Sequence, residues 1–197
     1  MSGGIRSVLP IVEGHGDAIA VPTLIRRIAH DHGLFELKTL RPHIRGDLPK
    51  IRPRLKDYLL TAAEEGAPVL WVMDYDCDTC TDVMRDIADL QTQAHLAAPH
   101  MPVRFAFMVK EFESLFLADE ATTRQVLKSI PLDAAFPSTP ESIRGAKEWL
   151  SKALPKGQAY KETIHQDRIS SQLSLEVLRK TSASFNRFER SLLDLIQ

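Results

Sequence analysis

The chain has 197 residues, of which 44% are hydrophobic and 26% are charged. This is the composition of an ordinary globular protein, and it excludes the disordered and fibrous classes. Lys and Arg (25) nearly balance Asp and Glu (26), so the net charge of −1 predicts no polyanion partner. The distribution of charge is uneven, however: residues 38–56 hold seven bases and one acid, whereas residues 74–89 hold six acids and one base.

Short apolar runs alternate with segments of helical periodicity over the first 110 residues. Residues 7–13 (SVLPIVE) end in an acid followed by glycine, which is typical of a buried strand leading into a turn. The other expected strands are 36–44, 68–74 and 103–109, and the expected helices are 17–32, 47–65 and 79–97. This order predicts an α/β fold with a mostly parallel four-stranded sheet and helices on both faces.

No strand pattern follows residue 111. Residues 119–129, 139–153 and 171–196 read as helical. We therefore expect an α/β core over residues 1–118 and a helical C-terminal extension over residues 119–197, packed on the core. The apolar face of the last segment is expected to complete the core; the alternative is a contact with another protein or with a second copy, as in a homodimer.

The two cysteines, Cys77 and Cys80, are too few and too close in sequence to form the disulfide framework of a secreted protein. No apolar stretch is long enough to span a membrane, and the first residues lack the pattern of a signal peptide. These features predict a cytoplasmic protein with no membrane partner. Both cysteines are accordingly expected to be reduced and free of metal.

Acidic residues follow three of the expected strands. Glu13 ends the first, Asp74 with Asp76 and Asp78 ends the third, and Glu111 with Glu113 follows the fourth. The carboxyl ends of parallel strands meet at one edge of the sheet, where ligands bind, so we expect Glu13 and Asp74 on neighbouring strands. Carboxylates gathered there would repel one another unless a divalent cation such as Mg²⁺ or Mn²⁺ lay between them. The alternative interpretation is that the acids solvate a loop and cap the next helix.

The turn after the first strand reads Glu13-Gly14-His15-Gly16-Asp17. Its glycines allow the backbone to approach a ligand closely, and Asp17 is within reach of the same edge as a ligand or, alternatively, as a helix cap. His15 could assist proton transfer or could simply be surface. The turn lacks the lysine and the length of a P-loop and the third glycine of a dinucleotide site.

Several short motifs resemble a known family. Glu-Gly-x-x-Asp at 13–17, Asp-x-Asp at 74–76 and the acid after the fourth strand look like the Toprim domain, a Rossmann-like metal-binding fold of topoisomerases, primases and nucleases of the overcoming-lysogenisation-defect type. The runs IVEG, VMDYDCD and ESLFLAD, with the tail motifs Tyr-Lys and Ser-Ala-Ser-Phe, resemble more narrowly the Toprim-related domain-of-unknown-function family 4276. The resemblance spans nearly the whole chain. Leu115 departs from it, since an aromatic residue is expected there, but this leaves Glu113 unaffected.

The resemblance implies a Mg²⁺- or Mn²⁺-dependent nuclease that acts on DNA or RNA, and for related proteins a role beside a partner ATPase in phage defence. The expected metal ligands are Glu13, Asp17, Asp74, Asp76, Asp78 and Glu113. Glu13, Asp74 and Asp76 would be catalytic, with Glu13 as ligand or general base. A lysine would neutralise the transition state, and the candidates for this role are Lys110 and Lys161.

Other functions remain open at this point. One is a non-catalytic or weakly catalytic interaction module that regulates a partner ATPase, and another is a metal-dependent phosphatase. Asp74-Tyr75-Asp76 also resembles the haloacid-dehalogenase phosphatases, but Asp78 stands where that family has Thr or Val. The motif also follows the third expected strand, whereas that family carries it on the first.

The segment after the third expected strand also carries parts of two other kinds of metal site. A calcium loop of the EF-hand type fails because Thr79 stands where Gly is needed and Arg85 where Glu is needed. The Cys pair could be half of a zinc site with His95 or His100, but there is no second Cys pair.

The basic residues form two sets, one in residues 38–56 and one in the helical part. The second set is Arg144, Lys147, Lys152, Lys156 and Lys161. The simplest interpretation is a solvated helix face; the alternative is a surface that follows a phosphate backbone, with affinity that falls steeply with salt. The acids Asp82, Asp86 and Asp89 on the helix after the third strand are expected to be surface residues that tolerate Ala.

Overall fold

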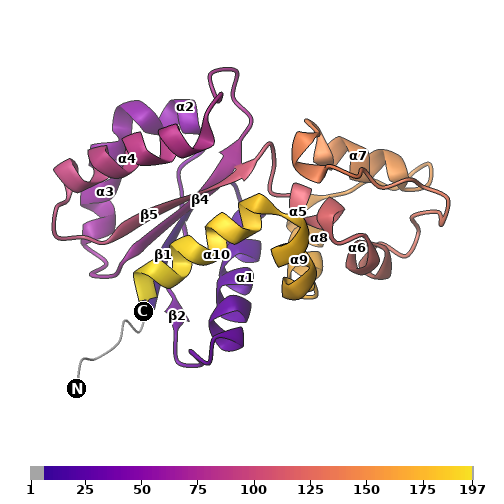
Figure 1. The fold of residues 1–197 in the computed structure, drawn as a ribbon, viewed down its shortest axis with the longest axis horizontal. Helices are drawn as coiled ribbons and strands as arrows, with labels where there is room; N and C mark the ends of the chain where they lie inside the picture. Colours follow the sequence, from indigo (N-terminus) through magenta and orange to yellow (C-terminus); the bar gives the residue numbers. More distant parts are fainter. Residues whose placement is uncertain (1–6, 197) are drawn as a thin grey trace.

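A parallel β-sheet forms the centre of the N-terminal half of the chain (Figure 1). The computed structural model describes residues 7–196. The strand order is β2-β1-β4-β5, with β3 also paired to β1, and every pairing is parallel. The strands are β1 (Ser7–Val12), β2 (Lys38–Thr39), β3 (His43–Ile44), β4 (Val69–Tyr75) and β5 (Val103–Val109). The predicted α/β class, the parallel sheet and the strand ends are confirmed.

The second expected strand, residues 36–44, is divided into β2 and β3, so the sheet has five strands where four were predicted. Both pieces lie beside β1: Lys38 pairs with Ser7, and His43 pairs with Ile11. Pro42 lies between them and has no N–H to donate, which explains the interruption of an otherwise continuous pairing.

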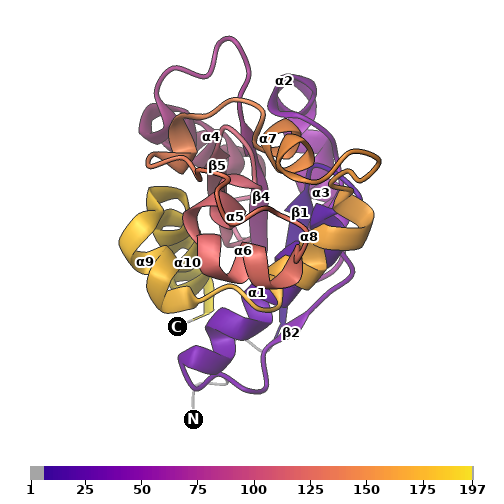
Figure 2. The ribbon, with the colours of Figure 1, turned by 90° about the vertical axis from the view of Figure 1, so that its right-hand side faces the viewer.

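Helices cover both faces of the sheet (Figures 1 and 2). Val8 and Val12 point to the face covered by α1 and α10, whereas Leu9 and Ile11 point to the face covered by α2, α3 and α4. These helices are α1 (Asp17–Asp31), α2 (Leu48–Ile51), the 3₁₀ turn η1 (Arg52–Arg54), α3 (Leu55–Ala63), α4 (Val83–Ala97) and α10 (Ala183–Ile196). No helix within residues 7–196 is long and apolar enough to cross a membrane.

Residues 114–181 form a group of short helices at the end of the sheet where β4 and β5 finish, on the right of Figure 1. They are α5 (Ser114–Ala118), α6 (Glu120–Val126), the 3₁₀ turn η2 (Pro140–Ser142), α7 (Ala146–Ala153), α8 (Glu162–Ser170) and α9 (Leu175–Thr181). The sequence pattern predicted neither α5 nor α8. Of the residues that α8 buries, Gln166 and Ser170 are polar, so this helix carries no continuous apolar stripe.

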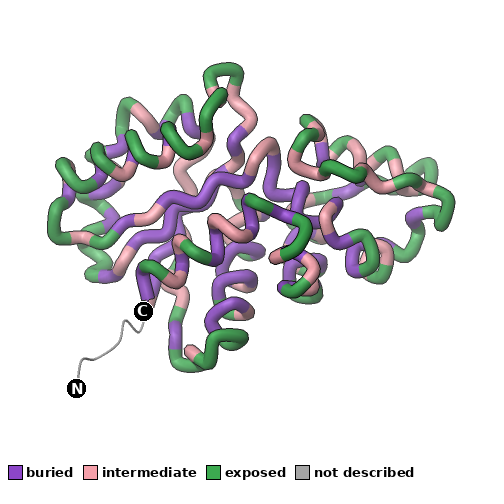
Figure 3. Tube along the Cα trace, in the orientation of Figure 1, coloured by how far each residue is buried: buried purple, intermediate pink, exposed green. Residues whose placement is uncertain are grey.

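The last segment packs on the sheet, as expected. Phe185, Phe188 and Leu192 of α10 are fully buried in the same core as β1 and β4, and Figure 3 shows α10 buried along its inner side. A break at Ser182 separates α9 from α10. The apolar face of α10 therefore completes the core. The division of the chain at residue 118 stays a prediction.

Of the acids expected on the surface of α4, Asp82 is exposed as predicted, whereas the prediction for Asp86 is wrong. Asp82 caps this helix by accepting hydrogen bonds from the backbone N–H groups of Met84 and Arg85 at 3.1 and 3.0 Å. Asp86 is 5% exposed, accepts a hydrogen bond from the Tyr75 hydroxyl and forms an ion pair with Arg52 at 2.9 Å. The acidic spacing along α4 does not reveal that this helix turns Asp86 towards β4. Asp89 is exposed, as expected.

The expectation that both cysteines are reduced is also wrong, because Cys77 and Cys80 form a disulfide. The turn after β4 is closed by a hydrogen bond from the Cys80 N–H to the Cys77 carbonyl at 2.9 Å. It brings the two Cα atoms to 5.1 Å, within the range that a disulfide requires. The prediction rested on the expected cellular compartment and did not consider this local geometry.

Candidate metal centre

The carboxyl ends of the central strands bring distant acids to one edge of the sheet. Glu13 directly follows β1, and Asp74 is the penultimate residue of β4. The two strands pair in parallel with Val12 beside Val72, which places Glu13 and Asp74 on neighbouring strands, as predicted. Glu113 lies after β5, where it begins α5.

Asp74 lies at the centre of this edge. Its Oδ1 accepts a hydrogen bond of 2.8 Å from the Phe112 N–H, and its side chain is 10% exposed. Burial raises the pKa of Asp74 well above its ordinary value, and the neighbouring charges of Asp17 and Glu113 raise it further. The protein thus holds this carboxyl in a place where its ionised form is poorly stabilised.

Glu13 and Asp74 line a cavity of about 300 Å³. Burial raises the pKa of Glu13 to about 7, and repulsion from Asp17 contributes to the rise. Asp76 and Asp78 line the same cavity, so four of the predicted ligands share one hollow. Its opposite wall comes from the start of α2, including Asp47.

Glu113 has the most buried carboxyl of the group, with no exposed surface. Its Oε1 accepts a hydrogen bond of 2.9 Å from the Tyr160 hydroxyl, whereas its Oε2 has no hydrogen-bond partner among the described residues. Burial raises the pKa of Glu113 to about 8. An ionised carboxylate with an unpartnered buried oxygen is costly, so this group calls for either a proton or a cation.

Asp17 uses both of its carboxyl oxygens within the fold. Oδ2 accepts from the Gly14 N–H at 3.0 Å, and Oδ1 accepts from the Gln166 side chain at 2.6 Å. Burial raises its pKa. Asp17 therefore closes the first turn and ties α8 to it, and it adds negative charge close to Asp74 and Glu13.

Among residues 7–196, Lys147 is the one cation that forms ion pairs with Asp74 and Glu113. Its Nζ lies 3.7 Å from Asp74 Oδ2, 3.9 Å from Glu113 Oε2 and 2.9 Å from Glu162 Oε1. Burial alone would lower the pKa of Lys147, but Glu113 and Asp74 outweigh it and hold that pKa above its ordinary value. The signal in the sequence was only its membership of the second basic set.

Glu111 explains how Lys147 reaches this position. Its Oε1 accepts from the Gly145 N–H and its Oε2 accepts from the Lys147 N–H, both at 3.1 Å. These are the first N–H groups of α7, which have no partner inside the helix, and a carboxylate there is favoured by the helix dipole. Glu111 therefore fixes α7 against the end of β5.

The remaining predicted residues lie further from the centre. The side chain of Asp78 is 94% exposed and pairs with Arg144 at 3.3 Å, and the same guanidinium donates to the Asp76 carbonyl. Lys110 follows β5, and its N–H donates to the Tyr75 carbonyl at 3.1 Å. Lys161 precedes α8 and lines a different cavity. Among residues 7–196, neither of these two lysines forms an ion pair with an acid.

One other acidic group has tighter spacing. In the described part of the chain, Asp31, His32 and Glu189 are the only three potential ligands whose atoms all lie within 4.8 Å of one another. Arg179 already pairs with Asp31 and with Glu189, at 2.5 and 2.6 Å. This group therefore has its own cation and carries no sign of a metal.

The strand-end acids fit a hard divalent cation. All their donor atoms are oxygens, and one buried oxygen, Glu113 Oε2, lacks a hydrogen-bond partner in the described part of the chain. The carboxyls of Glu13, Asp17, Asp74 and Glu113 face one another with a single lysine between them, and each has a raised pKa. These acids are spaced more widely than the ligands of a site in which protein groups alone surround the ion. Wide spacing suits Mg²⁺, because this ion keeps several of its waters.

A comparison with protein families places the chain in one of them. A family model described as a domain of unknown function, DUF4276, matches residues 12–193. The chain belongs to this family. The resemblance seen in the sequence motifs is thereby confirmed. No curated protein matches the chain.

Solved structures show remote likenesses to this DUF4276 protein. The C-terminal region of the Burkholderia pseudomallei OLD protein is 16% identical, with 96% of this chain and 98% of that chain covered and a TM-score of 0.48. The C-terminal region of the Xanthomonas campestris pv. campestris OLD protein is 15% identical, with 96% and 95% covered and the same TM-score of 0.48. At this distance no activity is inferred from either.

Proposed function

We propose that this protein is a Mg²⁺-dependent nuclease of Toprim type that hydrolyses phosphodiester bonds at the edge formed by Glu13, Asp74 and Glu113. The observation that carries the proposal is the excess of buried acid there. Four carboxyls there have raised pKa values, with Lys147 beside them, and Glu113 Oε2 has no hydrogen-bond partner among residues 7–196. Asp76 and Asp78 line the same cavity and extend the set of oxygen donors.

Each residue at this edge would have its own role in the hydrolysis. Mg²⁺ bound among the carboxylates would supply an activated water and neutralise charge on the phosphate. Glu13, with its pKa raised to about 7, is suited to accept a proton near neutral pH. Lys147 forms ion pairs with Glu162 and with Asp74, which lines the cavity, and would stabilise negative charge on the reacting phosphate. In this proposal Lys147 takes the role first considered for Lys110 and Lys161.

Basic side chains beside the cavity support a nucleic-acid substrate. Arg144 lines the cavity and is exposed. Leu48 and Pro49 of α2 form part of the cavity wall, and the basic stretch of residues 38–56 contains this helix. A strand whose phosphate lies in the cavity would therefore pass close to several cations, and its affinity should fall with added salt.

One observation favours a second candidate. Lys147 already forms ion pairs with Asp74, Glu113 and Glu162, so the cluster has an internal counter-ion without any metal. A chain stabilised in this way could serve as a non-catalytic module that regulates a partner ATPase, the role that the family resemblance implies for related proteins in phage defence.

Cleavage by the purified full chain separates the two candidates. Supercoiled plasmid and single-stranded RNA are incubated with the wild type, Asp74→Asn and Asp89→Asn in Mg²⁺, in Mn²⁺ and in EDTA. Asp89 is an exposed acid on α4 and serves as the matched control. We expect cleavage by the wild type and by Asp89→Asn that requires metal and is lost in Asp74→Asn. Absence of cleavage of both substrates would favour the interaction module.

A further inference from the structure

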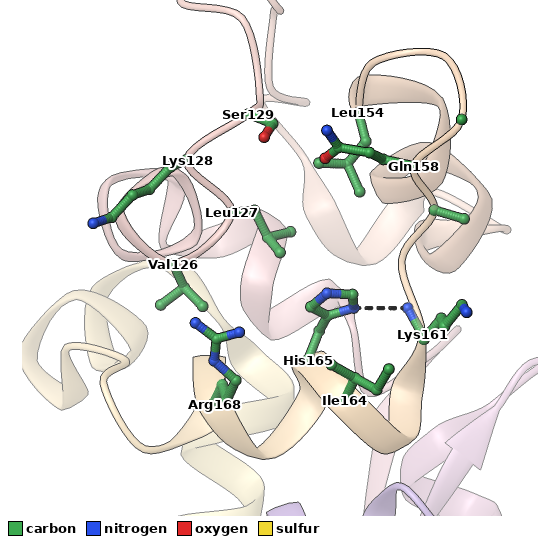
Figure 4. Close-up of a pocket in the computed structure, with 12 residues that line it drawn as sticks. Val126, Leu127, Lys128, Ser129, Leu154, Gln158, Lys161, Ile164, His165 and Arg168 are labelled. Atoms are coloured by element: carbon green, nitrogen blue, oxygen red, sulfur yellow. Dashed lines mark hydrogen bonds between the residues drawn. The ribbon is translucent and has the colours of Figure 1, made fainter.

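A second cavity, of about 530 Å³, lies in the helical part of the molecule (Figure 4). Its walls come from the end of α6, the loop after α7 and one face of α8. Its volume is within the range of pockets that hold small molecules. Nothing in the proposed nuclease chemistry uses it.

The charged groups around this cavity are all basic. Lys128, Lys161 and Arg168 line it, and no Asp or Glu does. All three are exposed, and in the described part of the chain none of them forms an ion pair with a carboxylate. In a protein with a net charge of −1, three cations around one hollow without an acid form a local positive field that favours an anion.

His165 adds a fixed hydrogen-bond donor. Its Nδ1 accepts a hydrogen bond of 2.8 Å from the Lys161 N–H, which leaves Nε2 as the protonated nitrogen of the neutral ring. Burial lowers the pKa of His165, so the ring is neutral at pH 7. In Figure 4 the second ring nitrogen points into the space below Leu127 and Gln158. The ring is held in place by stacking on Tyr160, with centroids 5.6 Å apart.

The rest of the wall is largely apolar. Val126 and Leu127 come from the end of α6, Leu154 from the loop after α7 and Ile164 from α8. Ile164 is 50% exposed and adds an apolar side chain that a ligand in the cavity could contact. A ligand that matches this cavity therefore combines an apolar part with an anionic group, as a nucleotide does with its base and phosphate.

We propose that this cavity binds a nucleotide, with its phosphate held by Arg168, Lys161 and Lys128 and its base against Leu127 and Leu154. The nucleotide has two sources, a free mononucleotide or one unit of a nucleic-acid strand.

The site is separate from the metal centre, although both use α8. Glu162 and Gln166 contact Lys147 and Asp17 at the metal centre, whereas the residues that line this cavity lie on another face of the helix. Binding here does not depend on the nuclease proposal.

Calorimetric titration of the full chain tests the proposal. The ligands are AMP, adenosine and an unlabelled single-stranded oligonucleotide, all in EDTA so that nothing is cleaved. The variants are Arg168→Gln and Lys161→Gln, and the matched controls are Arg190→Gln and Lys180→Gln, which are exposed and lie outside the cavity. Because all four residues are exposed, the variants should fold, and melting curves check this.

We expect AMP to bind, adenosine to bind at least tenfold more weakly, and each cavity variant to lose about tenfold in affinity, the equivalent of ~1.4 kcal/mol. The same loss seen only with the oligonucleotide would support the site and identify the strand as its ligand. The proposal is overturned if neither AMP nor the oligonucleotide binds, if adenosine binds as tightly as AMP, or if the cavity variants bind like the controls. These results stand whether or not the chain cleaves nucleic acid.

Discussion

Replacing Glu113 with Gln should stabilise the metal-free protein at alkaline pH. The carboxyl is fully buried and its pKa is raised from 4.5 to about 8. The folded protein therefore keeps this proton up to about pH 8, whereas the unfolded chain releases it near pH 4.5. Because the folded state binds more protons between these values, the free energy of unfolding falls as the pH rises from 4.5 to 8, and the full penalty is present above pH 8.

The size of this effect follows from the same two values. A rise from 4.5 to about 8 corresponds, at about 1.4 kcal/mol per pKa unit, to roughly 5 kcal/mol at most. Gln keeps an oxygen to accept the hydrogen bond from Tyr160, but its amide N–H₂ would face Lys147, which offsets part of the gain. We expect a net stabilisation of about 2–4 kcal/mol at pH 9 and little change at pH 5.

Urea denaturation in EDTA from pH 5 to pH 9 measures this difference, with the exposed Glu64→Gln as control. In the Glu113→Gln protein a smaller loss of stability should remain, because the pKa values of Asp74, Glu13 and Asp17 are also raised. If the wild type and Glu113→Gln lose stability in parallel from pH 5 to pH 9, Glu113 does not carry a strained charge, and the argument for a cation at this edge fails.

Three further predictions concern the packing and the chemistry around the site. Gly16→Ala should lower the free energy of unfolding by about 1–3 kcal/mol in urea denaturation, because a Cβ would lie 1.9 Å from Gln166 Oε1. Gly14→Ala should lower it by less, since the nearest atom to a Cβ there is 3.7 Å away. Equal losses in the two variants would contradict this. Asp86→Ala should lower the free energy of unfolding by about 2–4 kcal/mol, since it leaves the Tyr75 hydroxyl and Arg52 without their acceptor. A loss below about 0.5 kcal/mol would show that these contacts do not stabilise the fold. Lys147→Gln should abolish cleavage while the metal still raises the melting temperature; full activity would exclude Lys147 from catalysis.

Much of the sheet could be predicted because its signals are local. The apolar runs that form β1, β4 and β5 are short and bounded by turns, and each is followed by an acid. The parallel order then places these acids at one edge. Two features of the connections between strands were not predicted, namely the break at Pro42 and the disulfide between Cys77 and Cys80. Both depend on backbone geometry, which the spacing of apolar residues does not report.

The helical half of the site could not be read from the sequence. Lys147 reaches Asp74 from more than 70 positions along the chain, and it does so because Glu111 holds the start of α7. The helix α8 buries Gln166, a polar residue that hydrogen-bonds to Asp17. The contact between α8 and α1 is therefore not predicted by a pattern of apolar residues. Contacts of this kind depend on tertiary packing between polar groups, which is specific to the folded chain.

The central claim is that a divalent cation binds between Glu13, Asp74 and Glu113. Titration of the metal-free protein with Mn²⁺, followed by the electron paramagnetic resonance signal of free Mn²⁺, tests it directly. We expect the wild type and Asp89→Asn to remove Mn²⁺ from solution at a stoichiometry of one or two ions, with competition by Mg²⁺, and Asp74→Asn to bind at least tenfold more weakly, a loss of about 1.4 kcal/mol or more. Equal Mn²⁺ binding by all three proteins, or none by the wild type, would contradict the account.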